Sequence, residues 1–277
     1  MRKWISWLLP VGLLAAIYHP TFVWMVDRWL ARDSYYSHGF LIPIVSLFWV
    51  FQKRKLLSQL DKQTDNLGLI PLFVGVFMQL VSSLLRVYFL SAFSLVIIIL
   101  GAVHYLFGRK ILTQVWFPIA FLMLMIPLPL LVISELTLKM KFFVAQIATA
   151  CLNHIGIHAI REGSYIRMRN AFLLVGDPCS GLRSFLAFLC LGFVFAYGSG
   201  FALWKRLVLV GISLPVALLS NIGRIFLLGF MGEVYGMQYT QGLAHDASGI
   251  MTFVFALIIF MMMRRKLERF LVLEKLK

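Results

Sequence analysis

The sequence predicts an all-α integral membrane protein, a bundle of about eight transmembrane helices with both termini in the cytoplasm. Of the 277 residues, 61% are hydrophobic and 13% are charged, whereas soluble domains are roughly half apolar and about a quarter charged. This apolar content suffices for about eight stretches of about 20 residues, the length that crosses a bilayer. The composition argues against a soluble enzyme and a disordered chain, and three cysteines are too few for a disulfide-stapled protein.

Eight apolar runs, interrupted by charges or turn residues, mark the expected spans. They are residues 4–26, 40–52, 67–85, 87–107, 111–133, 182–204, 207–230 and 247–263. Two basic residues precede the first run, as in a secretory signal, but no small-residue cleavage site follows it. We therefore expect a retained first helix.

The net charge of +15 is distributed unevenly between the two predicted sides of the membrane. If the first span starts in the cytoplasm, most of the 26 Lys and Arg residues fall in cytoplasmic loops, as the positive-inside rule expects. The excess of basic residues thus reflects orientation, and we expect no nucleic-acid partner. We expect one polytopic domain over residues 1–277, without a soluble second domain or an internal repeat.

One long outer segment, residues 134–181, separates the fifth and sixth spans. Its first part, residues 136–157, mixes apolar side chains with lysines and a glutamine, which predicts an amphipathic helix on the outer leaflet or packed on the bundle. Residues 162–176 alternate around a turn-like centre at Asn170 and Ala171 and predict a short β-hairpin. The hairpin ends directly before a cysteine.

Cys179 carries the most informative chemistry. Asp177 is a suitable N-cap and is followed by a proline, so we expect Cys179 in the first turn of the sixth span. The helix dipole there, together with Arg183 four residues further on, would stabilise the reactive thiolate. Cys151 and Cys190 lack such surroundings, and we interpret them as small buried hydrophobes.

Arg224 and His245 are predicted to lie at the same membrane face as Cys179. An arginine at membrane depth is costly and is a functional candidate for that reason. At about 1.5 Å per residue, Arg224 lies about 27 Å and His245 about 28 Å from the cytoplasmic ends of their spans, close to the thickness of a bilayer core. Asn221, three residues before Arg224, would orient the guanidinium.

A thiol, an imidazole and a guanidinium at one face suit acyl transfer. The thiolate attacks a peptide carbonyl, the imidazole protonates the leaving amine, and the guanidinium stabilises the oxyanion or holds the substrate. Water would resolve the thioacyl intermediate in a protease, and another amine would resolve it in a transpeptidase.

At these residues the sequence resembles the exosortases and archaeosortases, which are multi-span membrane cysteine transpeptidases and proteases. The resemblance rests on Cys-Ser-Gly-Leu-Arg at 179–183, Asn-Ile-Gly-Arg at 221–224, His245, and an early stretch of Trp29, Asp33 and Tyr-Ser-His-Gly at 36–39. It extends from Trp29 to the eighth span.

The resemblance implies that Cys179 is the nucleophile, His245 the acid/base and Arg224 the third catalytic residue. Arg183 fits the exosortase form of the motif and, like Asn221, is taken as support. His38, in the early stretch, has no implied role, and we expect it to anchor the first outer loop. We expect no cofactor and no metal.

The implied substrates are exported proteins with a C-terminal sorting tail of the PEP-CTERM kind, which consists of a short motif, a transmembrane helix and a basic end. The implied location is the bacterial inner membrane, with the active site facing the periplasm, often in bacteria that make extracellular polysaccharide. The expected partners are these proteins, the lipid bilayer and a surface amine acceptor. Arg167, Arg169 or Arg183 would receive an acidic residue of the motif.

Two other functions stay open at this point. His154, His158 and Glu162 recur at four-residue spacing, which would place metal ligands on one helix face in a metal-dependent membrane protease. Gly156 interrupts that helix, so we favour an interfacial polar face. A transporter or lipid-binding scaffold would also have many spans and a buried arginine, although transporters usually place their polar groups near the midplane.

Overall fold

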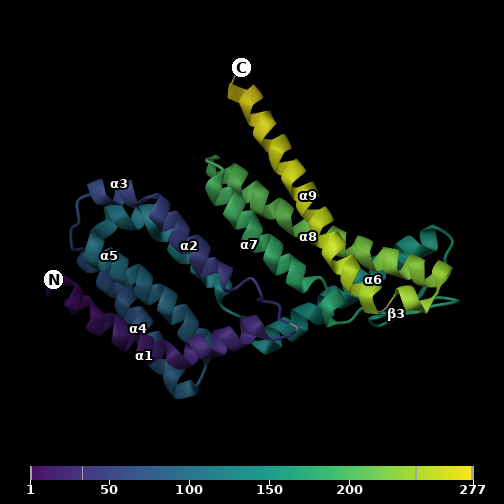
Figure 1. Ribbon diagram of the computed structural model, residues 1–277, viewed down its shortest axis with the longest axis horizontal. Helices are drawn as coiled ribbons and strands as arrows, with labels where there is room; N and C mark the ends of the chain where they lie inside the picture. The colour runs from purple at the N-terminus through teal and green to yellow at the C-terminus, as the bar shows by residue number, and fades with distance from the viewer. Residues whose placement is uncertain (1, 33, 241, 276–277) are drawn as a thin grey trace. The chain divides into compact units, whose positions relative to one another are not determined.

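The computed structural model describes residues 2–32, 34–240 and 242–275, and for residues 2–11, 178, 239, 242–246 and 269–275 it describes the backbone alone. The chain divides into two compact units, Met1–Pro129 and Leu130–Lys277 (Figure 1). That the chain acts as one polytopic domain stays a prediction.

The first unit is built from helices. They are α1 (Arg2–Leu30), α2 (Leu41–Gln52), α3 (Arg54–Gln59), α4 (Leu69–Leu85) and α5 (Tyr88–Phe121), with the 3-10 helices η1 (Asn66–Gly68) and η2 (Leu122–Met125). Helices α4 and α5 pack closely, because Gly75 faces Ile98 and Gly101 faces Leu72 at distances that leave no room for a Cβ. Small residues at such contacts let apolar helices approach each other in a membrane.

Helix α5 leaves helical geometry at Gly108, where φ is 80° and ψ is 174°. Glycine adopts this conformation at little steric cost, and the backbone of Gln63 occupies the space that a Cβ would need. The break falls between the expected spans 87–107 and 111–133. The expected span 111–133 extends too far, because the helical segment ends with η2 at Met125. Pro127 and Pro129 follow this end and interrupt the helix before α6.

A polar cluster inside the first unit joins α1, α4 and α5. Tyr18 Oη lies 2.7 Å from Ser94 Oγ, and Thr21 Oγ1 lies 2.6 Å from Ser91 Oγ. Both serine hydroxyls donate to Gln79 Oε1, at 2.7 and 3.1 Å. Polar groups withdrawn from water require such partners, so the cluster fixes α1 against the α4 and α5 pair.

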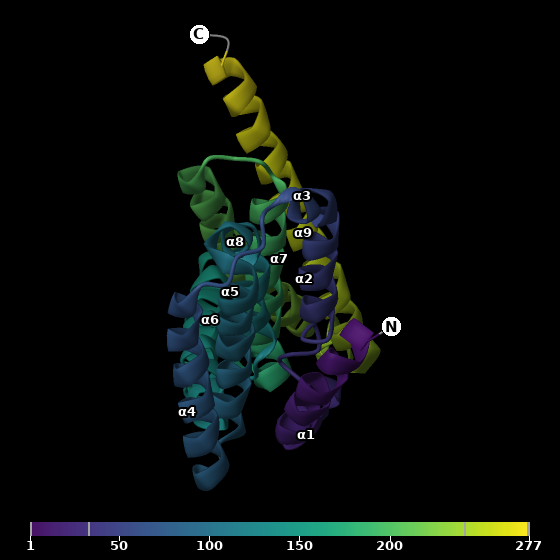
Figure 2. The ribbon, with the colours of Figure 1, turned by 90° about the vertical axis from the view of Figure 1, so that its left-hand side faces the viewer.

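The second unit combines helices with a small sheet. Its elements are α6 (Leu130–His154), β1 (Ile160–Glu162), β2 (Tyr165–Arg167), β3 (Phe172–Leu174), η3 (Asp177–Cys179), α7 (Leu182–Gly198), α8 (Leu203–Tyr235), η4 (Met237–Tyr239) and α9 (Gly242–Lys275). The strands pair antiparallel in the order β1-β2-β3. Helix α8 packs against α6, α7 and α9 (Figures 1 and 2).

The segment before the cysteine differs from the prediction in two respects. The helix expected over 136–157 is α6, which begins earlier, at Leu130. It ends at His154, because Gly156 takes a φ of 87° just beyond it. The expected hairpin corresponds to β2 and β3, and β1 adds a third strand. One face of the sheet buries Ile166 and Leu173 in a core that includes residues of α6 and α8.

The last three spans also differ from the prediction in length. Helix α7 ends at Gly198, before Gly200 with its φ of 67°, and α8 already begins at Leu203. Expected span 182–204 is therefore too long and span 207–230 too short. Helix α9 extends beyond 247–263 at both ends.

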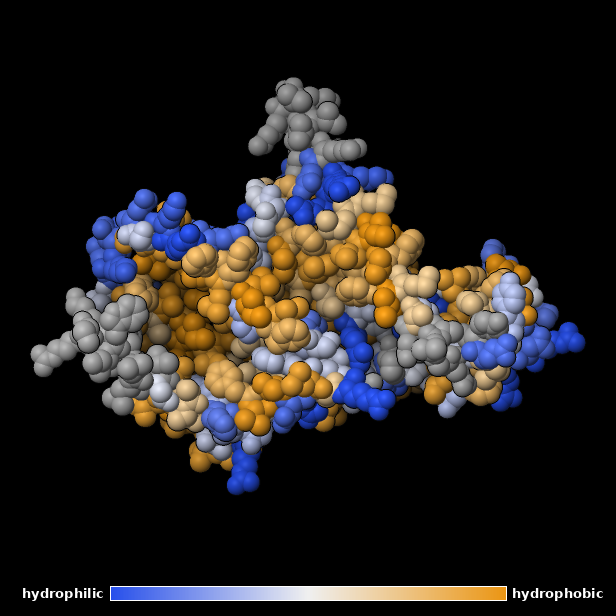
Figure 3. All heavy atoms as spheres, viewed as in Figure 1, coloured by the Kyte–Doolittle hydropathy of each residue, from blue (hydrophilic) through white to orange (hydrophobic). Residues whose placement is uncertain are grey.

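In the described part of the chain, four helical segments are long and apolar enough to cross a membrane. They are Asn66–Leu85, Tyr88–Met125, Leu203–Tyr235 and Ala247–Glu268, and Leu41–Gln52 and Leu182–Gly198 are shorter apolar helices. Apolar side chains cover much of the visible face of the helices, while hydrophilic residues gather at helix ends, for example around α3 (Figure 3). The chain is a predominantly helical, multi-pass membrane protein; eight spans and cytoplasmic termini stay predictions.

Candidate active site

Cys179 is the last residue of the 3-10 turn η3, which follows the sheet and precedes α7. Its side chain is 2% exposed and belongs to a core formed by α6, the sheet and α8. The Cys179 backbone N–H donates to the Gly176 carbonyl at 3.1 Å. None of the three cysteines forms a disulfide, so Cys179 is a free cysteine.

The helical surroundings expected for Cys179 are not observed. Gly181 adopts a left-handed conformation, with φ 83° and ψ −3°, and α7 begins only at Leu182. Cys179 therefore precedes α7 and does not lie in its first turn. The four-residue spacing to Arg183, the second residue of α7, consequently does not place the two side chains on one helix face.

Asp177 has a different role from the predicted N-cap. Gly176 occupies the N-cap position of η3, and no side-chain cap hydrogen bond is formed there. The Asp177 carboxylate instead forms an ion pair with Nζ of Lys141, which comes from α6 and is 19% exposed. Ser180 Oγ donates to the Asp177 carbonyl at 2.8 Å. These contacts attach the turn that carries the cysteine to α6.

Asn221 connects the same turn to α8. Its Nδ2 donates to the carbonyl oxygen of Cys179 at 2.9 Å, and its side chain is 5% exposed. Gly181 makes this approach possible, because a Cβ at that position would lie 2.7 Å from Nδ2 and 2.8 Å from Cγ of Asn221. A buried amide and a buried carbonyl are costly unless paired, so this hydrogen bond holds the main chain of Cys179 in place.

Arg224, one turn after Asn221, connects α8 to α9. Its Nε donates to Ser248 Oγ at 3.0 Å. Gly249 leaves space for the guanidinium, since a Cβ there would lie 3.3 Å from Cζ and Nη2 of Arg224. Ser248 was not among the site residues predicted from the sequence. The available signal was its helical spacing of three residues from the candidate histidine.

His245 lies near the start of α9, three residues before Ser248. Its side chain is outside the described residues, so its prediction as acid/base stays a prediction. Helical spacing places position 245 on the same side of α9 as Ser248. Asn221 contacts the Cys179 carbonyl, and Arg224, one turn later on α8, contacts Ser248 of α9. Position 245 therefore lies on the side of α9 that carries the contact with Arg224.

A narrow pocket borders these contacts. It is lined by Ser184 and Phe188 of α7, Asn221 and Arg224 of α8, and Gly249 of α9, among others. The three helices that carry or follow the candidate residues therefore meet at one place in the second unit.

The early stretch lies in the first unit. Trp29 Nε1 donates to the Met125 carbonyl at 2.9 Å, and Gly39 packs directly against the Trp29 indole. The rings of Tyr36 and His38 stack with centroids 6.0 Å apart. This packing fits an anchoring role for the loop between α1 and α2. Asp33 is outside the described residues.

The three residues of the alternative metal site, His154, His158 and Glu162, do not lie on one helix. Helix α6 ends at His154, Gly156 turns the chain, and His158 lies in the loop that follows. Glu162 belongs to β1 and pairs with Arg167 at 3.4 Å. In the part of the chain that the structure describes, no three His, Cys, Asp or Glu side chains form a group that could hold a metal ion.

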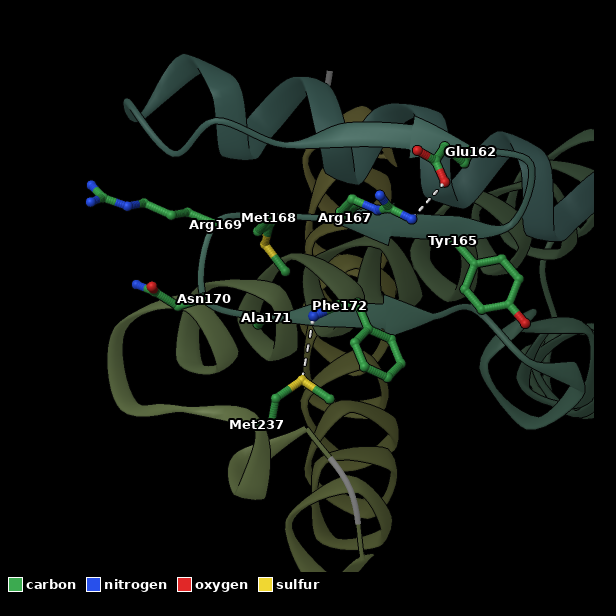
Figure 4. Close-up of a pocket in the computed structure, with 9 residues that line it drawn as sticks. All are labelled: Glu162, Tyr165, Arg167, Met168, Arg169, Asn170, Ala171, Phe172 and Met237. Atoms are coloured by element: carbon green, nitrogen blue, oxygen red, sulfur yellow. Dashed lines mark hydrogen bonds and ion pairs between the residues drawn. The ribbon is translucent and has the colours of Figure 1, made fainter.

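A second, open pocket lies along the sheet, which ends at Leu174, five residues before Cys179 in the chain (Figure 4). Tyr165 of β2 and Phe172 of β3 line it, and the Phe172 N–H donates to Met237 Sδ at 3.3 Å. Arg167 shares this pocket with its partner Glu162, whereas Arg169 extends away from that pair. No carboxylate among the described residues pairs with Arg169.

Helical segments that can cross a membrane, together with a buried cysteine whose main chain is held by Asn221 in the second unit, define a polytopic membrane protein with a candidate cysteine site. Residues 29–262 match the family model of the transmembrane exosortases. The chain belongs to this family. No curated protein and no solved structure matches it. Family membership supports a role as a membrane transpeptidase or protease.

Proposed function

We propose that the protein is a cysteine peptidase or transpeptidase that cleaves C-terminal sorting tails of exported proteins at the outer face of the inner membrane. Family membership supports the reaction class. The hydrogen bond from Asn221 to the Cys179 carbonyl carries the assignment of the site, because it joins the cysteine to the helix that bears Arg224.

The proposed reaction begins when His245 accepts the thiol proton of Cys179. The thiolate attacks the carbonyl carbon at the tail junction, and Arg224 stabilises the oxyanion that forms. When the peptide C–N bond breaks, the imidazolium returns the proton to the leaving amine. Water then converts the thioester to a carboxylate, or an acceptor amine converts it to a new amide, and either step releases the thiol.

Two further residues position the reacting groups in this proposal. Asn221 fixes the main chain of the nucleophile, and Ser248 holds the guanidinium of Arg224 through Nε. In this proposal the terminal nitrogens of the Arg224 guanidinium donate to the oxyanion. Arg183, at the start of α7, adds positive charge next to the cysteine turn.

The test is co-expression of the protein with an exported substrate that carries a C-terminal tail. The wild type should shorten the substrate, and His245→Gln should slow this by roughly 100-fold to 10,000-fold, the usual contribution of a general acid/base. Immunoblots of the substrate in a pulse-chase experiment measure the rate. His154→Gln and His158→Gln are matched controls that should retain wild-type rates. Normal rates in His245→Gln would contradict the proposal, and loss in both controls would favour the metal-dependent alternative.

We also propose that the pocket in Figure 4 receives an acidic residue of the tail motif at Arg169. Arg169→Glu is expected to lower processing of an acidic motif by about tenfold, because a charge-assisted contact becomes a repulsion. The matched control is Arg161→Glu, on the exposed strand β1 but outside the pocket lining. The rate should recover when the acidic residue of the motif is changed to lysine. An equal loss with acidic and neutral motifs would show that Arg169 does not read this charge.

A further inference from the structure

An apolar groove lies in the first unit between α2, α3 and α5. Its volume of about 650 Å³ falls in the range of ligand pockets, about 300 to 1,000 Å³. Leu47 and Phe51 of α2 form one wall and are 69% and 59% exposed. Ile111 and Val115 of α5 form the floor and are 6% and 4% exposed. The groove is therefore an open apolar surface with a closely packed base.

Two basic residues line this groove, and each places its charge over an aromatic ring that also lines it. Cζ of Arg54 lies 3.9 Å from the centroid of Phe51, and Nζ of Lys62 lies 5.8 Å from the centroid of Phe107. Such cation–π contacts hold a charge over an aromatic face while leaving its outer side accessible. The groove thus combines an apolar channel with two positive charges.

The nearby carboxylates pair with other residues. Asp61 lies 4.0 Å from Lys110, and Asp65 lies 2.9 Å from His104. No carboxylate of the described residues pairs with Arg54 or Lys62. The positive charge in the groove is consequently available to an anion.

The groove belongs to the membrane part of the unit. Its α5 residues lie in the segment Tyr88–Met125, which is apolar enough to span a bilayer, and α3 belongs to a basic loop that the positive-inside rule predicts to be cytoplasmic. Apolar surface open at this depth is covered by acyl chains, because water is excluded there. Basic pockets between helices on this side suit the headgroups of anionic lipids.

We propose that this groove binds one anionic phospholipid of the cytoplasmic leaflet, with an acyl chain along the apolar walls and the phosphate between Arg54 and Lys62. The apolar walls favour a lipid over a free phosphate, and the two cations favour an anionic headgroup over a zwitterionic one. The site lies in the first unit and does not depend on the proposed cysteine chemistry.

Native mass spectrometry of the full-length protein, titrated with phosphatidylglycerol or phosphatidylcholine in neutral detergent, tests this assignment. The wild type should bind one phosphatidylglycerol at least about tenfold more tightly than phosphatidylcholine. Arg54→Gln and Lys62→Gln should each weaken phosphatidylglycerol binding about fivefold, and the double variant about 25-fold. Lys55→Gln is the matched control, since Lys55 belongs to the same basic run but does not line the groove.

A second variant addresses the apolar part of the site. Ser58 is exposed at the rim of the groove, and Ser58→Trp should block the acyl chain while both cations stay in place, so it should lower phosphatidylglycerol binding about tenfold or more. Unchanged binding in Ser58→Trp and in the double variant would overturn the proposal. Equal affinity for phosphatidylcholine, or full displacement of the lipid by millimolar inorganic phosphate, would also overturn it.

Discussion

Cys179→Ala is expected to abolish tail cleavage, with a fall in rate of about four orders of magnitude or more. No other group in the proposed reaction supplies the thioester, and loss of a nucleophile from a coupled catalytic set removes most of its rate enhancement. The rate is measured as conversion of a tail-bearing substrate to its shortened form in a pulse-chase experiment. Because alanine is smaller than cysteine and equally apolar, the buried turn should retain its fold.

The other two cysteines provide the controls for this experiment. Cys151 is exposed on α6, so the buried position predicted for it is wrong, and Cys190 is partly buried in α7. Alanine at either position should leave cleavage within about twofold of wild type, as is usual away from a functional site. Hydroxylamine added to the wild-type enzyme should intercept the thioester and release the shortened substrate as a hydroxamate, and Cys179→Ala should form no hydroxamate. Normal processing by Cys179→Ala would remove the nucleophile from the proposed function.

Gly181→Ala is expected to reduce cleavage about 100-fold although it leaves every proposed catalytic group in the chain. The new Cβ must move Asn221, whose Nδ2 would be 2.7 Å away, and thereby release the hydrogen bond that holds the Cys179 carbonyl. Displacement of a reacting group by about 1 Å costs about 100-fold in rate. The left-handed φ adds about 1 to 2 kcal/mol of strain in an alanine. Cleavage rate and thermal unfolding in detergent measure the two effects.

Gly156→Ala separates backbone strain from the contact with Asn221. Gly156 has a similar φ of 87°, but nothing lies within 4 Å of its added Cβ. It should therefore lose a comparable amount of stability without a comparable loss of cleavage. Equal losses of cleavage in both variants would show that the approach of Gly181 to Asn221 is not what positions the cysteine.

The sequence predicted the helices whose ends are marked by local signals. Expected spans 40–52 and 67–85 agree closely with α2 (Leu41–Gln52) and α4 (Leu69–Leu85), because charges or turn residues bound these apolar runs. The cysteine turn was not predictable in the same way. Gly181 is left-handed where Asn221 approaches it, 40 residues away in the chain, and local propensity favoured a continuous helix from Asp177.

The candidate site was predictable only in the features that depend on a single helix. The free-energy cost of an arginine within the membrane indicated Arg224 as a functional residue. The spacing of three residues indicated that Asn221 lies next to it on one helix face. The observed partners, the Cys179 carbonyl for Asn221 and Ser248 for Arg224, depend on how α8 packs against α7 and α9. Sequence periodicity describes one helix at a time and does not contain that packing.

Asn221 and Arg224 lie three residues apart, on the same side of α8. A single rigid segment therefore sets both the main chain of the cysteine and the guanidinium proposed to face the oxyanion. If a thicker or thinner bilayer displaces α8 along its axis, the two groups travel together and their mutual spacing is preserved. A shift of α8 against the cysteine turn and α9 would therefore disturb both contacts at once, so we expect adaptation to a new membrane at the ends of α8 and not at its centre.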